Sequence, residues 1–152
     1  EVELCAQIFE YSAEEGPKAL ADEERTHGPK GRRGIVTYQP LGVIYSIQPW
    51  NFPMYQPIRV LAANLMAGNG CVLKHAEICT GSALRLREIC IEAGLPEDIF
   101  QVIIIDHDTS DTVIEHPKVR GITMTGSDGA GRHIGAKAAA ALKKTVLELG
   151  SN

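Results

Sequence analysis

The chain has 152 residues, 44% of them hydrophobic and 22% charged, which is typical of a globular domain that closes one core without disulfides or metals. Its formal net charge of −4 argues against nucleic acid or an anionic membrane as the main partner, because either would require a basic surface. No apolar run approaches the roughly 20 residues that a membrane span needs.

The first forty residues do not show the alternation of short strands and helices that the rest of the chain has. Glu1–Leu20 is predicted to be an amphipathic helix, with Val2, Cys5, Ile8 and Phe9 on one side. A Gly/Pro/basic loop follows at 26–33, and 34–38 is a short strand that leads into the remaining sequence. Because the sequence opens inside a helix pattern without Met, we expect it to be a segment of a longer protein.

From residue 42 onward, short apolar runs alternate with helical patterns. The predicted helices cover 53–65, 80–93, 109–115 and 127–139, and the predicted strands cover 42–47, 71–74, 99–105, 119–124 and 144–147. Glycines and prolines separate these elements. Strands that alternate with helices and are almost wholly apolar indicate a parallel sheet covered on both faces, so the predicted fold class is a doubly wound α/β domain.

In an open parallel sheet, ligands bind at the carboxyl ends of the strands. The residues at these ends carry an amide, an ammonium group, carboxylates and a hydroxyl; they are Gln48–Asn51, Lys74–Glu77, Thr125–Ser127 and Glu148–Gly150. We therefore expect Asn51, Lys74, Ser127 and Glu148 to converge on one crevice.

The Thr125-Gly126-Ser127 turn links a strand directly to a helix. Unpaired N–H groups at the start of that helix can bind an anion, and Gly126 would let a pyrophosphate approach the backbone. Ser127 is also a common N-cap residue, and the triplet taken alone favours simple capping of a surface helix. The usual GxGxxG dinucleotide fingerprint is absent.

Lys74 and Glu77 could hydrogen-bond the adenosine ribose of a dinucleotide. A carboxylate at that point would repel a 2′-phosphate, so Glu77 favours NAD over NADP. In isolation, the two residues could also be a solvated surface pair.

Trp50 is the only tryptophan, and it lies in a loop between two prolines. Asn51 beside it has an amide suited to a developing oxyanion, although it could simply close a turn. Glu148 could act as a general base or be an exposed carboxylate at a strand end.

The four cysteines, Cys5, Cys71, Cys79 and Cys90, form no CxxC pair and have no histidine at zinc-ligand spacing. We expect no metal site, four buried free thiols and a reducing, cytoplasmic location.

Several motifs together make residues from about Pro40 to Gly150 resemble the NAD-binding domain of the aldehyde dehydrogenase family. They are Pro49-Trp-Asn-Phe-Pro53, Ala67-Gly-Asn-Gly70, Leu73-Lys74, Thr125-Gly-Ser127 and Leu147-Glu-Leu-Gly150. Residues 1–39 resemble the helix and linking, oligomerisation segment that precedes this domain, and 40–152 the Rossmann-like domain itself. Lys74-His-Ala and 139–144 look most similar to succinate-semialdehyde dehydrogenases.

The resemblance implies that a cysteine thiolate attacks an aldehyde, that hydride passes to NAD or NADP, and that the thioester is hydrolysed. It implies that Asn51 is the oxyanion-hole amide and Glu148 the general base. It further implies cofactor contacts from Ile47, Gln48, Trp50, Asn51, Lys74, His75, Ala76, Glu77, Gly126, Ser127 and Leu149. Family members are commonly homo-oligomers that exchange strands near 34–38.

Two departures qualify the expected activity. The family's nucleophilic cysteine lies downstream of Glu-Leu-Gly, and none of the four cysteines here matches its motif, so we expect the chain alone to be inactive. Ser151 replaces a glycine that is usual in the family. The alternative function is a non-catalytic dinucleotide-binding or assembly module. A generic flavodoxin-like domain would leave Trp50, Asn51 and Glu148 unexplained.

Overall fold

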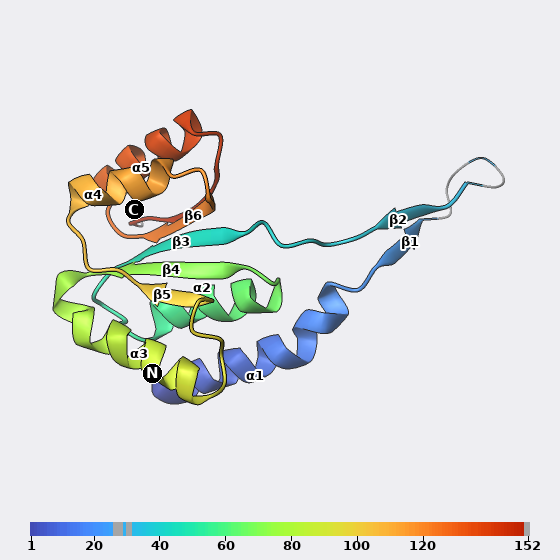
Figure 1. The fold of residues 1–152 in the computed structure, drawn as a ribbon, viewed down its shortest axis with the longest axis horizontal. Coiled ribbons are helices and arrows are strands. Elements are labelled where there is room, and N and C mark those ends of the chain that lie inside the picture. Colours follow the sequence, from blue (N-terminus) through green and yellow to red (C-terminus); the bar gives the residue numbers. More distant parts are fainter. Residues whose placement is uncertain (26–28, 30–31, 151–152) are drawn as a thin grey trace.

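The computed structural model describes residues 1–25, 29 and 32–150. Within them, five strands form one parallel sheet in the order β5-β4-β3-β6-β7 (Figure 1). The strands are β3 (Val43–Gln48), β4 (Gly70–His75), β5 (Phe100–Val102), β6 (Val119–Thr125) and β7 (Lys144–Glu148). The main helices are α1 (Val2–Ala19), α2 (Tyr55–Met66), α3 (Thr80–Glu92), α4 (His107–Glu115) and α5 (Asp128–Ala140). The doubly wound α/β prediction is confirmed.

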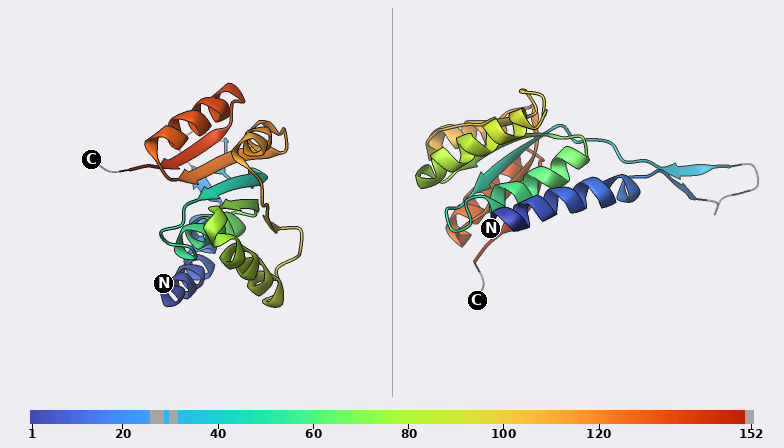
Figure 2. Two further views of the ribbon diagram at one scale, coloured as in Figure 1. Left: turned by 90° about the vertical axis from the view of Figure 1, so that its left-hand side faces the viewer. Right: turned by 90° about the horizontal axis from the view of Figure 1, so that it is seen from below.

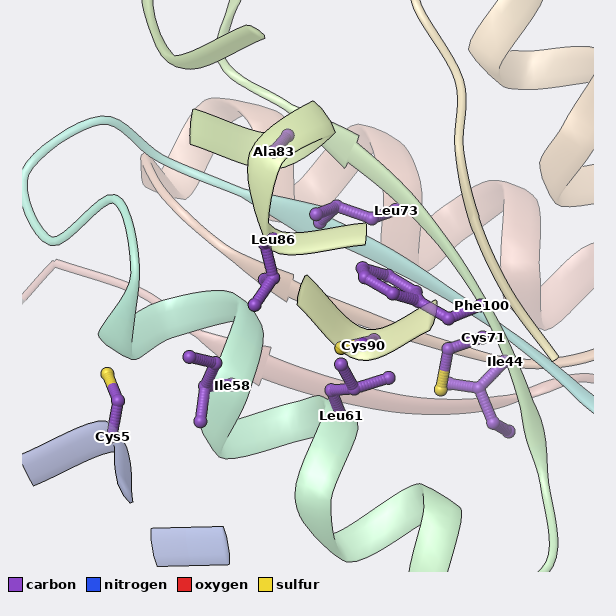
Figure 3. Close-up of a cluster of buried hydrophobic side chains, with 10 residues drawn as sticks. All are labelled: Cys5, Ile44, Ile58, Leu61, Cys71, Leu73, Ala83, Leu86, Cys90 and Phe100. Atoms are coloured by element: carbon purple, nitrogen blue, oxygen red, sulfur yellow. The ribbon is translucent and has the colours of Figure 1, made fainter. Parts of the chain in front are cut away.

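Helices cover both faces of this sheet, with α2 and α3 on one side and α4 and α5 on the other (Figure 2). The alternation of side chains along β3 shows how the two cores arise. Ile44 points into the core beneath α2 and α3, and Tyr45 points into the core beneath α4 and α5. The first core also contains Cys5 of α1, together with Ile58, Leu61, Cys71, Leu73, Ala83, Leu86, Cys90 and Phe100 (Figure 3).

Local sequence accounts for most element boundaries. Asp106 and Ser127 are the N-caps of α4 and α5, and their side chains accept hydrogen bonds from the backbone N–H groups of Thr109 and Ala130. Gly68 and Gly94 have positive φ values of 78° and 98° just after α2 and α3, where only glycine adopts the conformation without strain.

Strand ends differ from the sequence prediction at several places, and the differences at β5 and β4 matter most for the site. The expected strand at 99–105 is shorter, because β5 pairs with β4 only over Phe100–Val102 and the chain then leaves the sheet, with Ile104 65% exposed. The expected strand at 71–74 is longer, because β4 stays paired with β3 as far as His75. Lys74 and His75 therefore belong to the strand and do not follow it.

The N-terminal part forms a helix and a hairpin. Helix α1 packs against α2, whereas β1 (Glu23–Arg25) and β2 (Gly34–Val36) form an antiparallel pair that projects from the body (Figure 1). Strand β1 was not predicted, since three polar residues give no apolar alternation. Most of the loop expected at 26–33 lies outside the described residues. The domain boundary expected after residue 39 stays a prediction.

Candidate functional site

The parallel register aligns the carboxyl ends of β4, β3, β6 and β7 along one edge of the sheet. Ile47 lies beside Lys74 on one neighbouring strand and beside Met124 on the other. Gln48 is paired with His75, and Thr125 with Glu148. The strand ends thus form a continuous edge, as expected for a ligand site in such a sheet.

The expected site residues at this edge do not share one face. Side chains alternate along each strand, so Lys74 points toward α4 and α5 whereas Glu148 points toward α2. Lys74 lines one hollow and Glu148 lines another on the opposite face. Asn51 and Ser127 line neither, so the four residues do not converge on one crevice. An extended ligand that crosses the edge is needed to contact both hollows.

The hollow on the α4 and α5 side is a cavity of about 500 Å³. Its floor is apolar and its rim carries charged and polar groups. The lining residues are Ile47, Lys74, His107, Asp108, Ser110, Asp111, Met124, Ala130, His133 and Ile134. An apolar cavity with a few polar groups is typical of a small-molecule site.

Sequence reasoning found Ile47 and Lys74 in this cavity but missed the residues from the first turns of α4 and α5. A signal was present, since α4 follows the carboxyl end of β5 and α5 follows that of β6. His107, Asp108, Asp111 and His133 each have an ionisable side chain at such a turn or just beyond it. The candidate residues taken from the sequence were those directly after each strand, which left these helix positions out.

Asp111 is the centre of the charged rim. Its carboxylate lies 2.9 Å from His133 Nε2 and 3.2 Å from Lys137 Nζ, and Lys137 also contacts Glu115 at 3.0 Å. Burial opposes ionisation of Asp111, but the hydrogen bonds from His133 and Lys137 outweigh it and hold the pKa of this carboxyl below its usual value. Asp111 therefore carries a negative charge at neutral pH.

Ser110, which lines the cavity, forms a buried pair of hydroxyl groups with Tyr45. Tyr45 Oη and Ser110 Oγ are 2.7 Å apart, and Tyr45 is fully buried. Burial raises the pKa of Tyr45 to about 12, so its hydroxyl stays protonated at neutral pH.

The hollow on the α2 side is open and contains Glu148. The Glu148 carboxylate lies 3.3 Å from a terminal nitrogen of Arg59, and the second terminal nitrogen of Arg59 lies 3.4 Å from Thr125 Oγ1. The side chains of Arg59 and Glu148 are 34% and 50% exposed, so both remain accessible to a ligand. Arg59 is a further residue that the sequence analysis missed.

The loop between β3 and α2 displays Trp50 and Asn51 at the same edge. Trp50 is 69% exposed and Asn51 is also exposed. Gln48, at the start of the loop, is buried; its amide nitrogen donates to Ser46 Oγ at 2.9 Å, and its oxygen has no partner among the described residues.

The three residues after Lys74 have different surroundings. The buried His75 ring contacts the carbonyl oxygen of Pro53 and does not face the cavity. Ala76 donates its N–H to the carbonyl of Gln48. Glu77 is exposed at the start of a short 3₁₀ helix, Glu77–Cys79.

The turn after β6 provides both capping and an open helix start. Ser127 Oγ accepts from the N–H of Ala130 at 3.3 Å, so the capping interpretation is correct for its side chain. The N–H of Gly126 bonds to the carbonyl of Glu148 and is not free. Leu149 lies against Gly131 of α5, on the opposite face from Glu148.

The four cysteines are free and buried, as expected. Burial raises the pKa of Cys71 to about 12 and also raises the pKa of Cys90, so neither forms a thiolate readily. Over the described ranges we find no cluster of three potential metal ligands. The helices in the same part of the chain are too short or too polar to span a bilayer.

Comparison with known proteins identifies the family. The family model for the aldehyde dehydrogenase family matches residues 1–152. The chain belongs to the aldehyde dehydrogenase family. The resemblance seen in the sequence is therefore confirmed.

Two similar relatives are both named succinate-semialdehyde dehydrogenase [NADP(+)]. The protein from Mycobacterium avium is 41% identical over 149 residues, which cover 97% of this chain and 32% of the relative. The protein from Deinococcus radiodurans is 40% identical over 152 residues, which cover 100% of this chain and 31% of the relative. This chain thus spans about a third of the length of these aldehyde dehydrogenases.

Solved structures agree with the assignment. Succinic semialdehyde dehydrogenase from Streptococcus pyogenes, in complex with NADP+, matches with a TM-score of 0.93 and 39% identity over 98% of this chain and 32% of its own. The NAD-dependent aldehyde dehydrogenase from Sinorhizobium meliloti matches with a TM-score of 0.90 and 33% identity over 97% of this chain and 29% of its own.

Proposed function

We propose that this chain is the dinucleotide-binding part of an NAD(P)-dependent aldehyde dehydrogenase that oxidises an aldehyde to a carboxylate. The observation that carries the proposal is the cavity at the carboxyl ends of the strands, with a second hollow on the opposite sheet face that reaches the same edge at Glu148. The cavity is partly apolar and lies beside Lys74, and the second hollow contains the Glu148 carboxylate. A dinucleotide has two distinct ends and can reach across such an edge.

The cavity on the α4 and α5 side suits the adenosine half. Its apolar floor, which includes Ile47 and Met124, can pack against a planar base, and Lys74 can donate a hydrogen bond to a sugar hydroxyl. The start of α5 near Ser127 offers backbone N–H groups to the pyrophosphate. When bound, the cofactor accepts a hydride from the substrate.

Asn51 and Glu148 are proposed to act on the substrate at the carboxyl ends of the strands. Asn51 is exposed in the loop, so its amide can donate to an oxyanion. The carboxylate of Glu148 can take a proton from water. Trp50 and the Ile47–Gln48 backbone would line the cofactor path. Leu149 packs against α5, on the other face from Glu148, and is proposed to contact the nicotinamide where the cofactor crosses the edge.

The nucleophile has to come from outside this chain's four buried cysteines. An assay of the chain alone with NAD or NADP and a panel of aldehydes should therefore give no enzyme-dependent reduced cofactor. The same chain should bind the cofactor, which quenching of Trp50 fluorescence can measure. Turnover by the chain alone would refute this assignment of the nucleophile.

We propose succinate semialdehyde as the substrate, as the names of the relatives suggest. Its remote carboxylate requires a cation, and Arg59 is a half-buried guanidinium beside Glu148. In the full-length protein, Arg59→Met should raise the KM for succinate semialdehyde by about 10- to 100-fold, the effect of losing a charged hydrogen bond. The KM for butanal, which lacks the carboxylate, should change little. Equal effects on both aldehydes would exclude Arg59 as the carboxylate ligand.

We propose NAD as the preferred cofactor, with NADP as a weaker one, because the exposed carboxylate of Glu77 would repel a 2′-phosphate. Glu77→Gln should then improve NADP binding relative to NAD. Glu97→Gln, which removes an exposed carboxylate after α3, is the matched control and should leave the ratio unchanged. Tighter binding of NADP than NAD to the unmodified protein would contradict the proposal.

We further propose that the protein is a cytoplasmic homo-oligomer. Four free cysteines are compatible with a reducing compartment. The projecting β1–β2 hairpin carries the exposed apolar residues Ile35 and Val36, which support pairing with another copy.

A further inference from the structure

The Pro49–Pro53 loop needs a support outside itself. It carries Trp50 and Asn51, both exposed, and its two prolines cannot donate backbone hydrogen bonds. The oxyanion role proposed for Asn51 requires a fixed position, because a displacement of about 1 Å can cost on the order of 100-fold in rate. The support is found at the end of β4.

His75 and Ala76 hold both ends of this loop. The N–H of Ala76 donates to the carbonyl of Gln48 at 3.0 Å, where the loop begins. His75 Nε2 lies 2.9 Å from the carbonyl oxygen of Pro53, where the loop ends. Cys79 Sγ adds a weaker contact of 3.9 Å to the carbonyl of Trp50.

The hydrogen bonds also define which nitrogen of the His75 ring donates and which accepts. The N–H of Ala76 is shared between the Gln48 carbonyl and His75 Nδ1, which lies 2.9 Å away, and because an N–H can only donate, Nδ1 is an acceptor. The carbonyl of Pro53 can only accept, so Nε2 is the donor to it. His75 is 7% exposed, and both of its ring nitrogens are used. The ring bridges β4 and the loop.

We propose that His75 is a positioning residue that fixes Asn51 through the Pro53 carbonyl. The inference rests on the proposed function only in taking Asn51 as the oxyanion donor. Removing the Nε2 donor leaves the Pro53 carbonyl without this partner and loosens that end of the loop. That end is otherwise held by the bonds from the N–H groups of residues 54 and 55 to Glu1. Asn51 then loses its alignment although it is not itself changed.

Two amide variants of the full-length protein test the bridge. The amide nitrogen of Gln can reach the position of the histidine Nε2, whereas the shorter Asn reaches only that of Nδ1. His75→Gln should keep kcat within a few-fold of the unmodified enzyme, and His75→Asn should lower kcat by about 10- to 100-fold. The cofactor dissociation constant should change much less than kcat in both, because the ring does not line the cavity beside Lys74. Among the loop side chains, only Trp50 is proposed to line the cofactor path. Equal kcat values for the two variants, or a loss confined to cofactor binding, would overturn the proposal.

A double-variant cycle separates this inference from the proposed function. Asn51→Ala alone should lower kcat by about 100-fold or more. If His75 acts through Asn51, adding His75→Asn to Asn51→Ala should cause little further loss. Losses that multiply would refute the positioning role and leave Asn51 as the oxyanion donor. No effect of Asn51→Ala on kcat would refute the proposed role of Asn51 and the inference with it.

Discussion

The N–H of Gly126 donates a hydrogen bond of 3.0 Å to the carbonyl oxygen of Glu148. This bond joins the end of β6, where the pyrophosphate is proposed to bind, to the end of β7, which carries the proposed general base. It uses the one backbone donor of Gly126, so the reason for glycine at this position is steric. An added Cβ would lie 2.6 Å from Met124 Cε, the end of a buried side chain on the cavity floor.

Gly126→Ala should therefore weaken dinucleotide binding by moving Met124 into the cavity, with an affinity loss of about ten-fold or more. The matched control is Gly129→Ala in the same turn, where an added Cβ meets nothing within 4 Å. That variant should bind normally and gain about 0.5–1 kcal/mol of stability from its higher helix propensity. Titration of Trp50 fluorescence and thermal unfolding measure the two effects. Equal binding by both variants would exclude Met124 as the cause.

Ser127 combines two roles that substitutions can separate. Ser127→Ala removes the cap bond to Ala130 and should cost about 1 kcal/mol of unfolding free energy. Ser127→Asp keeps a capping oxygen and should preserve stability, but its charge should repel the pyrophosphate and weaken dinucleotide binding. Urea unfolding and cofactor titration of both variants test this separation. If Ser127→Asp binds the cofactor normally, the pyrophosphate does not approach this turn.

The sequence predicted which segments form the sheet and that they run parallel, because their apolar runs and helix periods are strong local signals; it did not predict the strand order within the sheet. It also identified the strand ends as the ligand edge, since that follows from parallel topology alone. It did not reveal that the side chains of Lys74 and Glu148 point to opposite faces of the sheet, because that depends on the register of the strands. The end of β4 was also predicted one residue too early.

The missed residues depend on contacts between distant segments. Asp111 and His133 meet only because α4 and α5 pack side by side, and Arg59 meets Glu148 across 89 residues of sequence. The ring of His75 is similar: its sequence neighbours suggest a cofactor contact, but the folded loop supplies the carbonyl of Pro53 as its partner. Such pairings have no signature in local periodicity.

The buried hydroxyl pair beneath the cavity should contribute to stability. Tyr45→Phe leaves Ser110 Oγ without its partner in a buried position, which should cost about 1–3 kcal/mol. Adding Ser110→Ala should recover part of that loss, because no hydroxyl then remains unpaired. Urea unfolding of the single and double variants measures the coupling. An unchanged stability for Tyr45→Phe would mean that Ser110 finds another partner.

Stability should decrease at alkaline pH. Burial raises the pKa of Cys71 from its ordinary value of 9.0 to about 12, so the folded state keeps its proton where the unfolded state loses it. The resulting stability is fully present below pH 9 and is lost as pH rises toward 12, by up to about 1.4 kcal/mol per pH unit. Cys71→Ala should reduce this slope between pH 9 and 10, where Tyr45 does not yet contribute. An unchanged slope would show that Cys71 does not control it.

The β1–β2 hairpin gives the last prediction. Over the described residues, β2 pairs with β1 alone, so its second edge is open, and Ile35 and Tyr38 are 49% and 46% exposed. An open edge with apolar side chains favours pairing with another chain, and a lysine on such an edge opposes it. Ile35→Lys should therefore shift the full-length protein toward smaller species in light scattering. Leu142→Lys is the control, since Leu142 is 95% exposed and lies after α5, remote from the hairpin in sequence. Because the hairpin projects from the body, Ile35→Lys should leave cofactor affinity unchanged. A lower molecular mass accompanied by a loss of cofactor binding would point to unfolding and would count against the hairpin as the interface.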